Sequence, residues 1–250
     1  MSLAMSAGFL EEILLASEDI SRCHGSLAKL ARHLKEPVMI TGSLAASWHL
    51  LENGRQIKKQ RLNDIDVVAK DLASLRPSLS RDFLIRHFHP TRGGGRILIM
   101  LIDEEHATRI DVFTPTTRML TRRLTDFAIG DIACRVIAAE DLSAKLLSVI
   151  YPITRGEPVE PKYVEHFRLL SAVVDPATMK AVWREYRKES HPLDFAEAAE
   201  AVERSLTAHP SLLQTGRYNQ DINEACSWCC QSERFPLAPL SMIYAIMGYV

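Results

Sequence analysis

The sequence predicts a mixed α/β protein (α+β in its layout), in which a mixed β-sheet core with flanking helices precedes a helical C-terminal region. Short apolar runs with strand character are interspersed with helical patterns through the first 150 residues. Beyond Tyr151-Pro152, a connector containing Gly and Pro leads into three amphipathic helical patterns. This change predicts a first domain over 1–152 and a helical region over 153–250.

The first half of the chain predicts helices and short buried strands. Apolar residues at helical spacing run over 9–34, with an expected break at 21–25. Pro37 ends this pattern, a strand follows at 38–40, and a helix over 44–51 ends at Glu52-Asn53-Gly54. After a basic loop, the remaining expected elements of this half are a strand at 65–69, a short helix at 72–79 broken by Pro77, and strands at 83–88, 96–102 and 108–113.

The second half turns from strand to helix. Two apolar alternating runs around Gly130-Asp131 predict a hairpin. Acidic residues then precede an apolar stripe at helical spacing, as expected at a helix N-terminus. The expected elements are strands at 124–129 and 132–137, and helices at 138–150, 163–174, 177–187 and 195–206.

Composition is that of an ordinary globular protein, with 250 residues, 47% of them hydrophobic and 24% charged. A formal net charge of −1 gives no overall attraction to nucleic acid or to a membrane. We find no secretory leader, no apolar run of membrane-spanning length, and no regular framework among the five cysteines. We therefore expect a cytoplasmic protein with no membrane partner.

Two carboxylates two residues apart are the main chemical feature. Asp64 and Asp66 alternate with Ile65 and Val67, so on a strand the two carboxylates point to one face. Like charges this close resist ionising together unless a cation lies between them. Asp111 has a similar apolar setting in a later strand. Three carboxylates on one sheet face predict a site for divalent metal ions.

Two simpler interpretations compete with this one. Asp64 and Asp66 could lie on the solvated face of an edge strand, although aspartate is poorly suited to strands. Asp103 or Glu105 could be the third carboxylate in place of Asp111. Because both fall in a predicted hairpin turn, whereas Asp111 lies inside an apolar strand, we prefer Asp111.

A Gly-Ser pair after a short strand, a helix, an Asp-x-Asp strand and a later strand carboxylate occur here in that order. Gly42-Ser43, Asp64-Ile65-Asp66 and Asp111 carry this pattern over roughly 36–150. It resembles the nucleotidyltransferase superfamily, which has the DNA polymerase β-like fold. Within it, the chain is most similar to bacterial stand-alone enzymes: antibiotic nucleotidyltransferases and the toxins of abortive-infection, type IV toxin–antitoxin systems.

The resemblance implies an enzyme that transfers a nucleoside monophosphate from an NTP such as ATP to a hydroxyl group. The acceptor would be a small molecule, a tRNA or a protein. Asp64, Asp66 and Asp111 would be catalytic and would bind up to two Mg²⁺ ions, a hard cation that prefers carboxylate oxygens. The alternative is a non-catalytic module that keeps the fold and binds a nucleotide or a toxin–antitoxin partner; the retained carboxylates argue against it.

Nucleotide binding is expected first at Thr41, Gly42 and Ser43. Glycine lets the backbone approach a phosphate closely, and the hydroxyl and the following helix offer donors to an anion. Ser43 could instead be an ordinary helix N-cap.

Two basic residues complete the expected nucleotide site. Lys145 corresponds, by the resemblance, to a helix lysine near the phosphates; its alternative is a surface pair with Asp141. Arg61 ends the basic loop over 55–61, which could grip a triphosphate or an RNA acceptor, or merely be solvated. Near the C-terminus, Cys226, Cys229 and Cys230 lack a second pair of ligands, so zinc is not expected.

Overall fold

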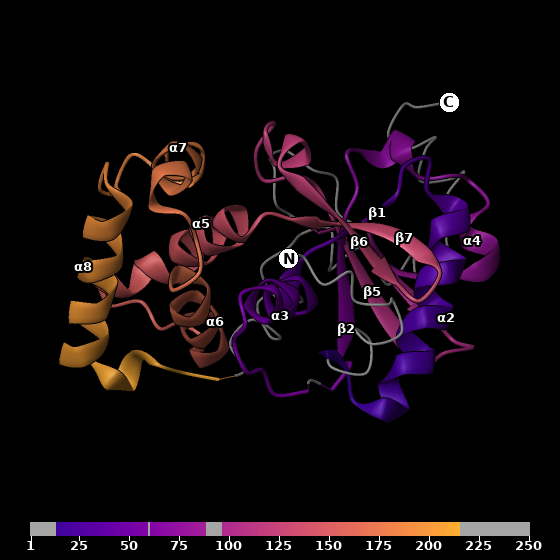
Figure 1. Ribbon diagram of the computed structural model, residues 1–250, viewed down its shortest axis with the longest axis horizontal. Helices are drawn as coiled ribbons and strands as arrows, with labels where there is room; N and C mark the ends of the chain where they lie inside the picture. The colour runs from indigo at the N-terminus through magenta and orange to yellow at the C-terminus, as the bar shows by residue number, and fades with distance from the viewer. Residues whose placement is uncertain (1–13, 60, 89–96, 216–250) are drawn as a thin grey trace.

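A computed structural model describes residues 14–59, 61–88 and 97–215 (Figure 1). It confirms the mixed α/β class, with a seven-stranded sheet, flanking helices and a helical region after the last strand. None of the described helices combines the length and the apolar character needed to cross a bilayer. The three cysteines near the C-terminus and the glycine run at 93–95 lie outside the described residues.

The sheet places β2 and β5 side by side near its centre. Its order is β3-β4-β5-β2-β1-β7-β6, and β2/β5 and β1/β7 are the parallel pairs. Every other neighbouring pair is antiparallel. The strands are β1 Val38–Ile40, β2 Asp64–Val68, β3 Leu84–Phe88, β4 Ile97–Asp103, β5 Thr108–Phe113, β6 Leu124–Ile129 and β7 Ile132–Ile137.

Helices cover the sheet on both sides. In Figure 1, α2 and α4 lie on one side and α3 on the other, while α5 runs from the sheet in among the C-terminal helices. The helices are α2 Ser17–His33, α3 Gly42–Glu52, α4 Leu79–Asp82, α5 Ala139–Ile150, α6 Pro161–Ser171, α7 Pro176–Tyr186 and α8 Phe195–Ala208. Short 3-10 turns lie at Leu72–Ser74, Leu120–Arg122, Tyr151–Arg155 and Pro210–Leu212.

One local prediction is wrong and another holds. Helix α2 runs unbroken through 21–25, where a break was expected. Its Gly25 packs against the ring of His106, and a Cβ there would lie 2.7 Å from His106 Cε1. The short helix expected at 72–79 is interrupted at Pro77, as predicted: a 3-10 turn precedes the proline and the separate α4 follows it.

The apolar core divides inside α5. Leu142 belongs to the cluster that packs around the sheet, whereas Ala144 and Leu147 belong to the cluster of the C-terminal helices. Trp183 of α7 is fully buried in the second cluster. Helix α5 therefore joins the two parts, and the predicted domain boundary at 152 falls just after its end.

Candidate functional site

The three predicted carboxylates meet on one face of the sheet. Asp66 of β2 pairs with Asp111 of β5 in the parallel ladder, so their side chains are lateral neighbours. Asp64 is two residues earlier on the same face, while Ile65 and Val67 are buried on the other. Each carboxylate offers an oxygen within 4.8 Å of the others.

Gly42 lies directly against this cluster. It begins α3 with a φ of +67°, and a Cβ built on it would lie 2.7 Å from both Cβ and Cγ of Asp66. The backbone N–H of Thr41 donates to the Asp66 carbonyl at 2.9 Å, which fixes the start of α3 against β2. Glycine is required here both for its backbone conformation and for the space it leaves.

Burial and neighbouring carboxylates raise the pKa of both Asp64 and Asp66. Burial and the neighbouring Asp64 raise the pKa of Asp66 to about 7. Burial, and then the charge of Asp111, also raise the pKa of Asp64. Negative charge is therefore concentrated where the protein solvates it poorly, as at a site built to receive a cation.

An arginine that the sequence analysis did not single out lies on the same face. Arg109 precedes Asp111 by two residues and pairs with Asp64 across the β2/β5 ladder. Its Nε donates to Asp111 Oδ1 at 2.8 Å, and its Nη2 donates to Asp111 Oδ2. A carboxylate oxygen has two lone pairs, so Asp111 can still face a cation while it holds Arg109. Strand alternation was the signal that could have identified it.

Lys145 lies next to the carboxylates and is not paired with Asp141. Its ammonium lies 4.8 Å from the centre of the Phe113 ring, on the strand that carries Asp111. Burial lowers its pKa, and the charge of Asp66 opposes that change. Asp141 is fully buried and accepts instead from Arg123.

A second cation comes from the C-terminal helices. Lys162, the second residue of α6, lies close enough to Asp64 for its charge to lower the pKa of that carboxyl, against the effect of burial. Helix α6 packs on both α3 and α5, the helices that begin at Gly42 and carry Lys145. The helical region thus contributes to the surroundings of the carboxylates.

The remaining predicted residues have different settings. Thr41 is buried at the start of α3, and Ser43 is half-buried in its first turn. Arg61 is ion-paired with Glu18 and, at 3.4 Å, with Asp19 at the start of α2. Its predicted role in nucleotide binding would require it to leave these partners.

Asp103 and Glu105, the competitors of Asp111, lie in a different network. Asp103 is fully buried and accepts from Ser26 at 2.8 Å, Lys29 at 2.7 Å and His106 at 2.7 Å. Glu105 pairs with the same lysine at 2.6 Å. Although Asp103, Glu105 and His106 could together ligate a metal ion, a lysine ammonium already supplies the cation. This network fastens α2 to the β4–β5 turn.

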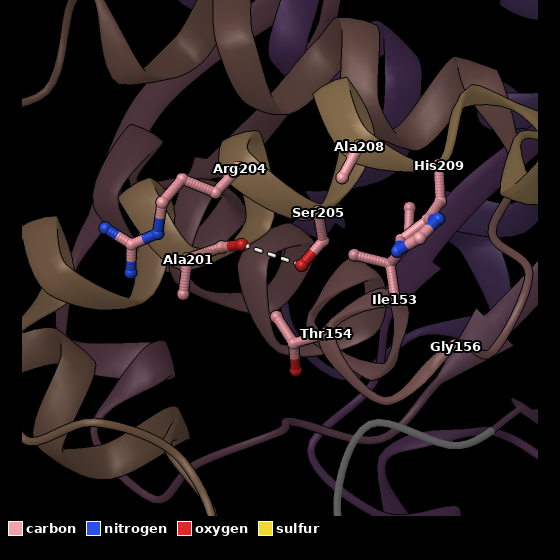
Figure 2. A pocket seen from close by; sticks show the side chains of 8 residues that line it. All are labelled: Ile153, Thr154, Gly156, Ala201, Arg204, Ser205, Ala208 and His209. Carbon is pink, nitrogen blue, oxygen red and sulfur yellow. Dashed lines mark hydrogen bonds between the residues drawn. The ribbon is translucent and has the colours of Figure 1, made fainter.

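A surface hollow of about 400 Å³ lies elsewhere, between the 3-10 turn after α5 and helix α8 (Figure 2). Two of its polar side chains already have partners: Ser205 donates to the Ala201 carbonyl at 3.0 Å, and Arg204 pairs with Glu200 at 3.2 Å. We assign it no role in the chemistry.

Comparison of the sequence with known protein families finds no family model that matches it, and comparison with curated proteins finds no significant match. The functional argument therefore depends on the site itself.

Proposed function

We propose that this protein is a Mg²⁺-dependent nucleotidyltransferase that transfers a nucleoside monophosphate from an NTP to a hydroxyl acceptor in the cytoplasm. The observation that carries the proposal is the meeting of Asp64, Asp66 and Asp111 within 4.8 Å, against the start of α3. Three carboxylates are the hard oxygen donors that Mg²⁺ prefers. The lack of a Cβ at Gly42 lets the side chain of Asp66 lie directly against the start of α3.

The residues divide into an acidic and a basic set. Asp64, Asp66 and Asp111 would hold Mg²⁺, which would neutralise charge on the triphosphate and orient it. Lys145 lies next to Asp66 and would bind a phosphate oxygen, as would the free backbone N–H groups at the start of α3. Lys162 approaches from α6 on the side of Asp64.

The proposed reaction is an in-line displacement. The acceptor oxygen forms a bond to the α-phosphorus while the bond from that phosphorus to the bridging oxygen breaks. Pyrophosphate leaves with the electron pair, and the hydroxyl proton passes to Asp111 or to solvent. Arg109 donates two hydrogen bonds to Asp111, and these fix the orientation of that carboxylate.

Neutralising the paired aspartates tests this function. Asp64→Asn and Asp66→Asn should each lower pyrophosphate release from an NTP at least about 100-fold, because an amide is a poor ligand for Mg²⁺. Release would be measured with each NTP in a cell extract that supplies acceptors. Asp126→Asn, at an exposed position on β6, is the control and should leave release unchanged.

The alternative, a non-catalytic module, makes a different prediction. Calorimetry would then detect NTP binding that requires Mg²⁺, but no label would pass from NTP to any acceptor. Mg²⁺-dependent label transfer that survives both aspartate substitutions would contradict the proposed site.

A further inference from the structure

Helix α7 carries a row of cations that the proposed chemistry does not use. Lys180 and Arg184 lie four residues apart on α7 and therefore share a face; Arg187 caps the C-terminus of this helix, and Lys188 follows beyond its end. At a rise of 1.5 Å per residue, the stretch from Lys180 to the C-cap Arg187 is about 10 Å long. Lys180, Arg184 and Lys188 are exposed, and Arg187 is half-buried.

The cations of this row border a hollow. Lys180, Arg184 and Arg187 line a surface depression of about 390 Å³ together with Leu193 and Asp194. Asp194 is the acid on its rim, and its carboxylate already accepts the backbone N–H of Ala196 at 2.8 Å as the N-cap of α8. The depression is therefore positively charged.

Arg187 also has an unsatisfied donor. Its Nε is buried and has no hydrogen-bond partner within the described structure. A buried N–H without an acceptor is destabilising, so a ligand that supplied an acceptor would be favoured. Within residues 14–59, 61–88 and 97–215, no ion pair engages any member of the row.

The positive charges of the row also affect a buried histidine, His191. His191 packs on Trp183 with nearly parallel rings and accepts the Lys188 N–H on its Nδ1. Burial and then the charges of Lys188, Arg155 and Arg187 lower the pKa of His191 to about 4. The ring therefore stays neutral and adds no charge to the row.

We propose that this row and its hollow bind the phosphate backbone of a nucleic acid, with RNA as the favoured ligand. A line of cations suits a polymer that carries negative charge at regular intervals. Guanidinium groups bind phosphate with two parallel hydrogen bonds, and Arg184 and Arg187 supply two of them. The proposal that the row binds RNA stands independently of the proposed function. The further idea that this RNA is the acceptor, with the hydroxyl at its end receiving the nucleotide, rests on the proposed function.

The row is held in a defined position relative to Lys145. Tyr186, within the same helix, donates to Asp141 of α5 at 2.8 Å, and Glu185 accepts both Nη atoms of Arg123. Asp141 lies one helical turn before Lys145. A backbone bound along α7 would thus be fixed relative to the helix that faces the carboxylates.

Binding of a fluorescein-labelled 20-nucleotide single-stranded RNA, followed by anisotropy, tests the proposal. EDTA is present and NTP is absent, so catalysis plays no part. The wild-type protein should bind, and Lys180→Glu with Arg184→Glu should weaken binding at least about 10-fold at 50 mM salt. The slope of log K against log salt should become shallower by about 1.4, or 0.7 for each phosphate that the variant no longer neutralises.

The control carries the same change of charge elsewhere. Lys35→Glu with Arg76→Glu, at two exposed positions on the sheet domain, should weaken binding less than about 2-fold. Arg187→Gln, a single change in the hollow, should also weaken binding. This variant keeps the proposal testable if the double variant folds poorly. Asp64→Asn should bind RNA like the wild type, which separates this site from the proposed catalytic one.

Competitors identify the ligand. Unlabelled RNA should displace the probe, and single-stranded DNA should do so less well; equal displacement would assign the row to any nucleic-acid backbone. Wild-type protein that fails to bind RNA, or an α7 variant that binds as well as its control, would overturn the proposal. So would displacement by poly-glutamate at the same phosphate-equivalent charge, which would indicate an acidic protein partner, or by equimolar inorganic phosphate, which would indicate a small-anion site.

Discussion

At the scale of single residues, the site depends on what Gly42 lacks. Gly42 and Gly54 have almost the same backbone conformation, with φ of +67° and +69°, yet only Gly42 has a neighbour in the way of a Cβ. The two glycines flank the same helix, α3. This pair separates the cost of the backbone conformation from the cost of the clash with Asp66.

Gly42→Ala and Gly54→Ala should therefore differ. Gly54→Ala should lower the free energy of unfolding by about 1 kcal/mol and leave nucleotidyl transfer unchanged. Gly42→Ala should cost roughly 1–3 kcal/mol more and lower transfer strongly, because Asp66 must move. Urea unfolding and initial rates would be compared, and equal behaviour of the two variants would show that space beside Asp66 is not needed.

The raised pKa of Asp66 gives stability a definite pH dependence. The folded protein binds this proton up to about pH 7, whereas the unfolded chain releases it near 3.8. Between these values the folded state holds more protons, so the free energy of unfolding falls as pH rises, and it levels off above pH 7.

In EDTA, the wild-type protein should lose roughly 1–3 kcal/mol relative to Asp66→Asn between pH 5 and pH 8. The two proteins should be similar at pH 5, where Asp66 is protonated and resembles the amide. Mg²⁺ should restore wild-type stability at pH 8. An unchanged difference across the range would mean that the carboxylate is ionised throughout.

At the scale of elements, the sequence revealed much of the site because strand alternation is reliable where one face is apolar. The position of Asp64 and Asp66 on one face, and the meeting with Asp111, followed from alternation and order. The adjacency of Arg109 to Asp64 did not, because it depends on the register of two parallel strands far apart in the chain. The contact of Lys162 with the site depends on how α6 packs.

The ion pair between Asp103 and Lys29 also depends on how distant elements pack, and its contribution to stability can be tested. Asp103→Asn should lower the free energy of unfolding by about 2–4 kcal/mol, because Lys29 loses its buried counter-charge. Transfer by the folded protein should be unchanged. Asp71→Asn, whose carboxylate accepts the N–H of Ser74 at 2.9 Å in an exposed turn, is the control and should cost no more than about 1 kcal/mol. Loss of transfer without loss of stability would return Asp103 to the candidate site.

At the scale of the whole molecule, the two parts of the core are linked by one polar network. Arg123, just before β6, contacts Asp141 of α5 with two hydrogen bonds of 2.7 and 2.8 Å and also contacts Glu185 of α7. Tyr186 donates to the same buried Asp141. The sequence did not indicate this network, because its members are dispersed between positions 123 and 186 and have no local pattern.

Arg123→Met should lower the free energy of unfolding by about 3–5 kcal/mol, because it leaves Asp141 charged and buried. Calorimetry should then separate the unfolding of the sheet domain from that of α6–α8. Arg168→Met is the matched control: its pair with Glu203, at 2.6 Å, is exposed on both sides and should contribute less than about 1 kcal/mol. A single sharp transition in Arg123→Met would mean that apolar packing in α5 suffices to couple the two parts.

The hydrogen bonds from Arg109 to Asp111 affect whether the chain can fold without a metal ion. Zinc fingers fold only with their ion, because the free energy of metal binding supplies the free energy of folding. Here one carboxylate already has an internal counter-ion, and Lys145 and Lys162 lie near the others. If the site binds Mg²⁺ as proposed, a newly made chain can therefore complete its fold before the ion arrives, and removal of the ion should stop nucleotidyl transfer without unfolding the protein.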